Sequence, residues 1–164
     1  MTKKNNEKGF TMMEVLAAIY VITVGVMGIF SLVQQIISFT DISSSRLAAI
    51  YLAQEGIEIV RNIRDGNWLE ARMVEVSWDE GLPIGDYNTD YRTQSLPDPN
   101  CTGEYLKFDG NFYICSADSS AKFQRKITIT PEGSDILKVS VEVSWQERGR
   151  THKAKAQENL YRWY

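Results

Sequence analysis

The chain has 164 residues, with 18 lysine and arginine side chains against 21 aspartate and glutamate side chains, which gives a formal net charge of −3. This length suits one domain together with a membrane anchor. The mild acidity argues against a soluble part that binds nucleic acid, because such a body presents a basic surface. No nucleic-acid partner is therefore expected for the soluble part, except through a local basic patch.

A short basic segment stands ahead of a long apolar run near the N-terminus. The basic segment contains Lys3, Lys4 and Lys8, and no charged side chain occurs from Val15 to Val33. At 1.5 Å per residue, a helix of this length crosses the hydrocarbon core of a bilayer, which is about 30 Å thick. The lysines favour a cytoplasmic N-terminus, so the C-terminal part is expected outside the cytoplasm.

Three interpretations of this N-terminal segment compete. A secretory signal peptide has a shorter apolar core that is followed by a small-residue cleavage site. The apolar run here is longer, and no clear cleavage site of that kind follows it. A plain transmembrane anchor explains the length of the run but not Glu14 at its start, because a carboxylate near the membrane is costly and usually serves a function. The third interpretation follows from a resemblance.

The residues Gly9, Phe10, Thr11 and Glu14, followed by the uncharged run, resemble the class III signal of the type IV pilin and pseudopilin family. In this family a prepilin peptidase cuts after the glycine, and the new N-terminal residue becomes methylated. The resemblance thus implies Gly9 and Phe10 as the cleavage pair and Phe10 as the methylated residue. It implies Glu14 as the acid that neutralises the N-terminal amine of a neighbouring subunit during assembly.

The resemblance also implies a division of the chain into four parts. Residues 1–9 are the leader, residues 10–37 the transmembrane and filament-core helix, residues 38–66 its amphipathic continuation, and residues 67–164 an extracytoplasmic β head. Removal of the leader would leave 15 basic and 20 acidic side chains, a mature charge of about −5.

The helix is predicted from Phe10 to about Asp65, because no proline occurs before residue 83 and Gly66 then provides a stop. Gly25 and Gly28 weaken the helix within the membrane run, and they are either points of local melting or points where another helix approaches closely. Apolar residues recur at helical spacing further on and predict a stripe that packs on the protein's own sheet: Ala49, Leu52, Ala53, Gly56, Val60 and Ile63.

The head reads as an antiparallel meander, because period-two alternation and turn residues dominate it. An Asp-Gly pair between aromatic runs predicts a hairpin. Strands grouped after a helix indicate an α+β fold, which here would be pilin-like. The expected strands cover residues 73–78, 105–115 (the hairpin), 123–130, 136–146 and 151–163.

Cys101 and Cys115 flank the predicted hairpin. Outside the cytoplasm they are candidates for a disulfide, and two free buried thiols are the alternative. In the chain-entropy model, closing a loop of about 15 residues stabilises the fold by roughly 3 kcal/mol.

No catalytic constellation is evident in the sequence. Motifs for zinc, phosphate or nucleophilic chemistry are missing, so the chain is not expected to be an enzyme or to carry a cofactor or metal. One loop holds several carboxylates, which leaves calcium as an alternative; they are Asp79, Glu80, Asp86 and Asp90.

Residues 22–29 and 48–68 are similar to minor pilins of the PilV type. The function implied is a structural subunit, a minor pilin, of a type IV pilus or related filament, held in the inner membrane before assembly and in a surface filament afterwards. Its partners would be prepilin peptidase, other pilin subunits, the pilus assembly platform and membrane lipid. The alternatives are a minor pseudopilin of a type II secretion system, a competence pilus subunit and, in another class, a membrane-tethered ligand-binding module.

Overall fold

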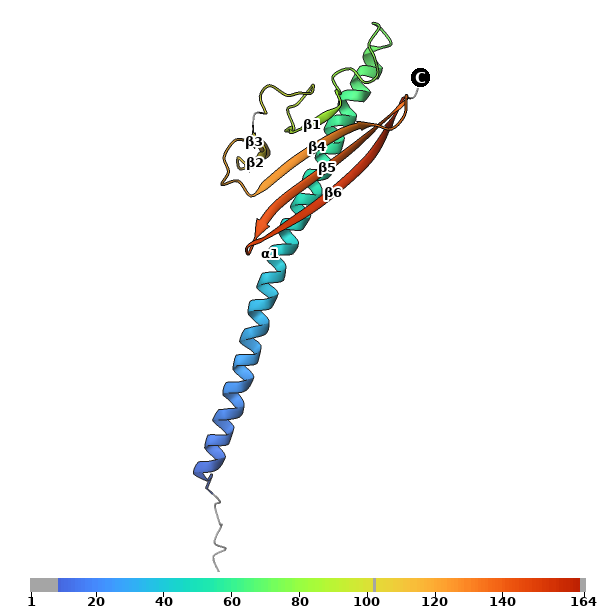
Figure 1. Cartoon of the computed structure of the whole chain (residues 1–164). Coiled ribbons are helices and arrows are strands. Elements are labelled where there is room, and N and C mark those ends of the chain that lie inside the picture. The colour runs from blue at the N-terminus through green and yellow to red at the C-terminus, as the bar shows by residue number, and fades with distance from the viewer. Residues whose placement is uncertain (1–8, 102, 163–164) are drawn as a thin grey trace, which may run out of the picture. The chain divides into compact units, whose positions relative to one another are not determined.

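The structure, a computed structural model, describes residues 9–101 and 103–162 and has an α+β fold (Figure 1). One helix precedes six strands, and the chain divides into two compact units, Met1–Ser43 and Ser44–Tyr164. Most of the predicted leader lies outside the described residues, as does the end of the last predicted strand. The elements are α1 (Met12–Glu70), β1 (Gly85–Tyr87), β2 (Tyr105–Phe108), β3 (Tyr113–Ser116), β4 (Phe123–Pro131), β5 (Ile136–Glu147) and β6 (Arg150–Tyr161).

The first unit contains the N-terminal part of α1. Every residue from Met12 to Ile37 is exposed, and this part of the helix is long and apolar enough to cross a membrane. The hydroxyls of Thr23 and Ser31 donate to the carbonyl oxygens of Tyr20 and Met27, at 2.8 and 3.1 Å. These polar side chains are therefore satisfied within the helix, as a lipid environment requires. The helix is a candidate membrane span.

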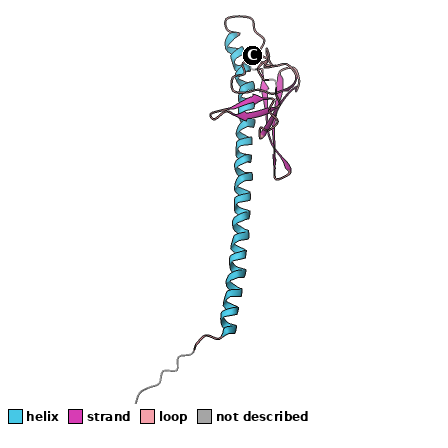
Figure 2. Ribbon diagram, turned by 90° about the vertical axis from the view of Figure 1, so that its left-hand side faces the viewer, coloured by secondary structure: helices cyan, strands magenta, loops and turns pink. Residues whose placement is uncertain are grey.

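In the second unit the six strands form one antiparallel sheet in the order β3-β2-β4-β5-β6. Figure 2 shows these strands beside the C-terminal part of α1. Strand β1 also pairs with β4, opposite residues 127–129, while β2 pairs with β4 opposite residues 123–124. The two short strands thus follow one another along the same edge of β4. This arrangement places the loop between them next to the buried face of the sheet.

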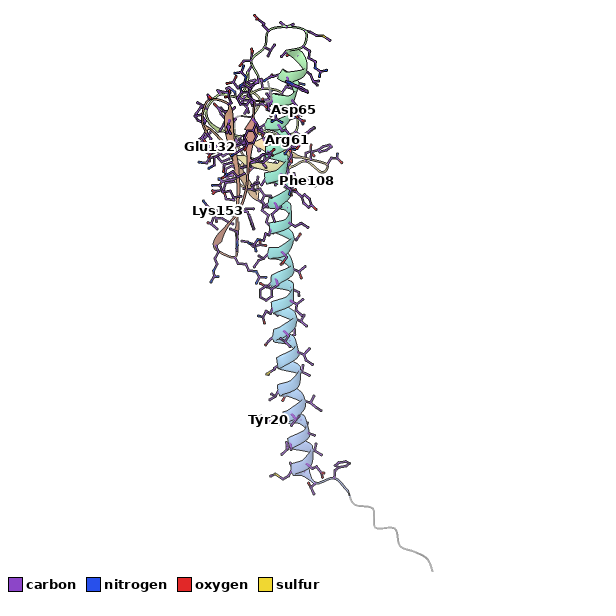
Figure 3. All side chains as sticks on the ribbon, turned by 90° about the vertical axis from the view of Figure 1, so that its right-hand side faces the viewer. Tyr20, Arg61, Asp65, Phe108, Glu132 and Lys153 are labelled. Atoms are coloured by element: carbon purple, nitrogen blue, oxygen red, sulfur yellow. A yellow bond between two sulfur atoms is a disulfide. The ribbon has the colours of Figure 1, made fainter. Side chains whose placement is uncertain are left out.

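The core lies between α1 and the inner faces of β4 and β5. The predicted helical stripe is confirmed, since all six of its residues are buried. The helix and sheet are also linked at the surface, where Arg61 (labelled in Figure 3) donates to Glu158 on β6 as well as to Glu58 on its own helix. Inward positions alternate along the two long strands; they are Phe123, Arg125, Ile127 and Ile129 on β4 and Leu137, Val139, Val141, Val143 and Trp145 on β5.

Gly56 marks the closest approach of α1 to the sheet. A Cβ atom at this position would lie 2.9 and 3.2 Å from the two methyl carbons of Val141 and 3.4 Å from Cδ of Arg125. Side-chain carbons do not normally approach so closely. Glycine is therefore required here for packing, although it lowers helix propensity by about 1 kcal/mol.

Gly56→Ala should lower the free energy of unfolding by about 1 kcal/mol, because overpacking costs about 1–3 kcal/mol and exceeds the gain in helix propensity. Gly66→Ala is the matched control, since nothing lies within 4 Å of a Cβ there, and it should raise stability by about 0.5–1 kcal/mol. Urea unfolding of the full chain in detergent measures both. A stabilising Gly56→Ala would contradict the close approach.

Arg125 is a charged residue at an inward position of β4, and its side chain is fully buried. Its guanidinium donates to the carbonyl oxygen of Leu52 on α1 at 3.1 Å, and to the carbonyl and hydroxyl oxygens of Thr89 in the loop after β1. Glu55 lies 3.7 Å away. Burial lowers the pKa of Arg125, and Glu55 and Asp90 oppose this shift. Arg125 thus joins helix, strand and loop inside the core.

Three sequence predictions about element boundaries need correction. Residues 73–78 form no strand, because the N–H groups of Met73 and Val74 donate to the carbonyl of Glu70 and keep the chain in a turn after the helix. The helix continues through Gly66 to Glu70 and does not stop near Asp65. The hairpin is confirmed, but its turn lies one residue later than the predicted Asp109–Gly110 pair. It covers residues 109–112 and centres on Gly110 and Asn111.

Candidate functional site

The chain just ahead of α1 is exposed and non-helical. Gly9 and Phe10 are both exposed, and Phe10 keeps 83% of its accessible surface. The helix begins at Met12, which is two residues later than the predicted start at Phe10. The two residues that flank the Gly9–Phe10 peptide bond are therefore both accessible to solvent.

Thr11 and Glu14 form a reciprocal cap on the first turn of α1. The N–H of Glu14 donates to the Thr11 hydroxyl at 3.3 Å, and the N–H of Thr11 donates to the Glu14 carboxylate at 3.5 Å. This is the capping-box pattern, in which two otherwise unpaired backbone donors are satisfied. The signal is present in the sequence, as a threonine followed three residues later by a glutamate, but the start predicted at Phe10 lies two residues too early to use it.

The cap fixes where the negative charge of Glu14 lies. Its carboxylate sits at the N-terminal end of α1, where the helix dipole stabilises an anion. Because the side chain is exposed, its remaining oxygen lone pairs can accept from a second donor. An ammonium group from another chain is a suitable donor, since a charge in a low-dielectric medium is stabilised by an opposite charge.

The apolar surface of α1 follows directly after this cap. Residues from Val15 to Val33 are exposed, and they include the two glycines predicted as points of melting or close approach. Both are helical, and nothing lies within 4 Å of a Cβ at Gly25 or Gly28. Their open sides offer room for a neighbouring helix to approach closely.

Cys101 and Cys115 form a disulfide, with Cα atoms 5.1 Å apart, as predicted. It fastens the loop ahead of β2 to the edge strand β3. The N–H of Cys115 also donates to the Asp90 carboxylate at 3.4 Å, and Asp90 is paired with Arg92 at 2.5 Å. Covalent and polar links together hold the long loop between β1 and β2 against the sheet.

Asp90 should make the stability of the second unit sensitive to acid. Burial raises the pKa of Asp90, but hydrogen bonds from the Arg92 side chain and from the N–H groups of Arg92 and Cys115 outweigh it, so the pKa is lowered. A carboxylate with a lowered pKa stabilises the folded chain at pH values above its ordinary pKa of about 4. This contribution is lost as the pH falls below that value.

The loss of stability between pH 7 and pH 3 should therefore be smaller in Asp90→Asn than in the native chain. Urea unfolding at the two pH values, followed by tryptophan fluorescence, measures the difference. An equal loss in both proteins would show that the carboxylate does not contribute.

The four loop carboxylates considered for calcium do not converge on one point. Asp79 accepts from Ser77, Asp86 accepts from Thr128 and Lys126, and Asp90 is paired with Arg92. Within residues 9–101 and 103–162, no group of three or more histidine, cysteine, aspartate or glutamate side chains is placed to hold a metal ion.

Comparisons with protein-family models, with curated proteins and with solved structures find no match for this chain. Inference about function therefore rests on the chain's own residues.

Proposed function

We propose that this chain is a structural subunit of a type IV pilus or a related filament, a minor pilin that is processed by prepilin peptidase and assembled through its N-terminal helix. The observation that carries this proposal is the exposed Gly9–Phe10 bond ahead of a helix that is capped by Thr11 and Glu14 and continues as an exposed apolar surface. A plain anchor needs neither the acid nor its position in the first turn.

In this proposal each part of the N-terminal segment has a distinct use. Residues 1–9 are removed, and the new amine on Phe10 is methylated. Residues 10–37 first lie in the lipid of the inner membrane with the head outside the cytoplasm, and then pack against other pilin subunits in the filament. Glu14 accepts a hydrogen bond from the amine of a neighbouring subunit as the assembly platform adds it, because each charge is then matched by an opposite one in a low-dielectric surrounding.

Gly9→Val should block removal of the leader, because a branched side chain replaces the glycine at the proposed cleavage pair. The mature N-terminus, identified by mass spectrometry, should begin at Phe10 in the native chain, whereas the variant should keep residues 1–9. Gly66→Ala, far along α1 and with an open Cβ position, is the control and should be processed normally. Normal processing of Gly9→Val would overturn the proposed signal.

The alternatives make different predictions about the cell. A membrane-tethered ligand-binding module should remain in the membrane fraction, whereas a filament subunit should co-purify with filaments sheared from cells. A minor pseudopilin of a type II secretion system, or a competence subunit, would share the processing. Gene context separates the pilus from the secretion system: a neighbouring gene for a retraction motor would indicate a pilus, and one for a secretion gate would indicate the secretion system. The carboxylate in the first turn favours the filament subunit over the tethered module.

A further inference from the structure

An open cleft of about 500 Å³ lies at the end of the second unit where α1 terminates. Its size falls within the range of about 300–1,000 Å³ typical of small-molecule sites. Four segments contribute to it: the last turn of α1, the loop that follows it, the turn between β4 and β5, and the residue after β6. The lining includes Trp68, Arg72, Ser77, Trp78, Ser134 and Arg162.

The two tryptophans of the cleft lie on neighbouring parts of the chain, Trp68 in the last turn of α1 and Trp78 in the loop that follows it. Trp78 packs against the hydrophobic core, and its carbonyl accepts from the Asn67 side chain at 3.3 Å. Asn67 also donates to the carbonyl of Glu80 at 2.6 Å, so the loop is fastened to the helix end. Trp68 lies on α1 itself and remains 37% exposed. The cleft thus offers preformed aromatic surface, and little ordering is needed before a ligand binds.

The two guanidinium groups of the cleft differ in their partners. Arg162 lies 3.6 Å from the Asp135 carboxylate, so its charge is already matched. Arg72 stands over the Trp68 ring at 5.0 Å from its centroid, and no carboxylate in the described part of the chain lies within ion-pair distance of it. A guanidinium held over an aromatic ring keeps its N–H groups free to bind a planar anion in bidentate fashion.

The polar rim supplies hydroxyl and carboxylate groups as well. Ser77 and Ser134 border the cleft, and Asp79 accepts from the Ser77 hydroxyl. Such groups exchange hydrogen bonds with ligand hydroxyls. A purely apolar acid would leave these rim groups unused, and a neutral sugar would leave Arg72 without a partner. A ligand with an apolar ring face, several hydroxyls and one carboxylate satisfies all three kinds of group.

We propose that this cleft is a binding site for an acidic saccharide, with the sugar ring against the tryptophan surface and the uronic carboxylate on Arg72. The site lies wholly within the second unit and does not depend on processing or assembly. A chain that fails to form filaments can therefore still bind the sugar, and a chain that forms them can fail to bind it.

Binding is tested with the full chain in detergent micelles, titrated with glucuronate, with glucose as the neutral ring and with acetate as the carboxylate without a ring. Calorimetry or ligand-observed NMR should show at least about tenfold tighter binding of glucuronate than of either partial ligand, the factor expected for one modest charge-assisted hydrogen bond. Equal binding of glucuronate and either partial ligand, or no binding of glucuronate, overturns the proposal.

Arg72→Gln should remove the preference for glucuronate over glucose, and Trp68→Phe should weaken binding of both sugars. Arg150→Gln is the matched control. Arg150 lies at the start of β6, whereas the cleft lies beside the residue that follows the end of this strand. This variant should therefore bind glucuronate like the native chain. Circular dichroism checks that each variant is folded. If Arg72→Gln keeps the preference, or if Arg150→Gln loses it to the same extent, the assignment of the carboxylate to Arg72 is wrong.

Discussion

Glu14→Gln should leave removal of the leader intact and lower incorporation into filaments by about tenfold or more, which corresponds to a loss of at least about 1.4 kcal/mol. Glutamine keeps the shape of the side chain and can still accept the hydrogen bond from Thr11 N–H that the carboxylate accepts at 3.5 Å. The helix cap therefore remains, and only the charge is lost. In the low-dielectric interior of a membrane or filament, the amine on Phe10 of the neighbouring subunit then has no opposite charge.

The measurement is the ratio of processed chain in the sheared filament fraction to processed chain in the membrane fraction. Glu70→Gln is the control, since Glu70 is an exposed acid in the last turn of the same helix, and its ratio should equal that of the native chain. Normal incorporation of Glu14→Gln would remove the proposed role of the acid. Failure of cleavage in this variant would place the defect before assembly and would also count against that role.

Arg125→Met should lower the free energy of unfolding by about 2–3 kcal/mol, within the range found when a buried polar group is left without its partner. Methionine fills much of the space, so the effect comes mainly from polar groups left unpaired. The buried Thr89 loses its donor, and Glu55 loses the cation 3.7 Å away. The loop that carries Thr89 and Asp90 should also loosen, because Arg125 joins it to α1.

Lys126→Met is the matched control on the neighbouring residue. Its side chain is 59% exposed and pairs with Asp86 at 3.3 Å on the surface, so its loss should cost no more than about 1 kcal/mol. Urea unfolding of the full chain in detergent, followed by tryptophan fluorescence, compares the two variants. A cost below about 1 kcal/mol for Arg125→Met would show that the buried network is replaceable by apolar packing.

Periodicity predicted the elements of this fold wherever one face of an element is buried. The stripe on α1 and the alternation along β4 and β5 were read from residue spacing, because burial on one face imposes those spacings. The same alternation pattern failed at residues 73–78. Those residues alternate like a strand, but they follow the helix end directly and pair with no neighbouring strand. Residue spacing alone does not show whether a segment has a strand to pair with.

The polar contacts of the head were beyond prediction for a different reason. The alternation on β4 does place Arg125 inward, between Phe123 and Ile127, yet its partners are 36 and 73 residues away along the chain. The cleft likewise gathers Trp68 and Arg72 from the end of α1 and Arg162 from just after β6, which are far apart in the sequence. At the N-terminus, by contrast, Thr11 and Glu14 are three residues apart, so their cap could have been predicted from the sequence.

The buried core of the second unit starts inside α1, and this determines where the chain can be cut without loss of the fold. The Ser45 hydroxyl accepts from the Lys122 ammonium at 2.6 Å, and Ala49 is completely buried. A protease that cleaves ahead of Ser45 would release a body with its core complete. Cleavage between Ala49 and Glu70 would instead divide the core itself. Shedding of an intact head is thus restricted to the stretch of α1 that precedes Ser45.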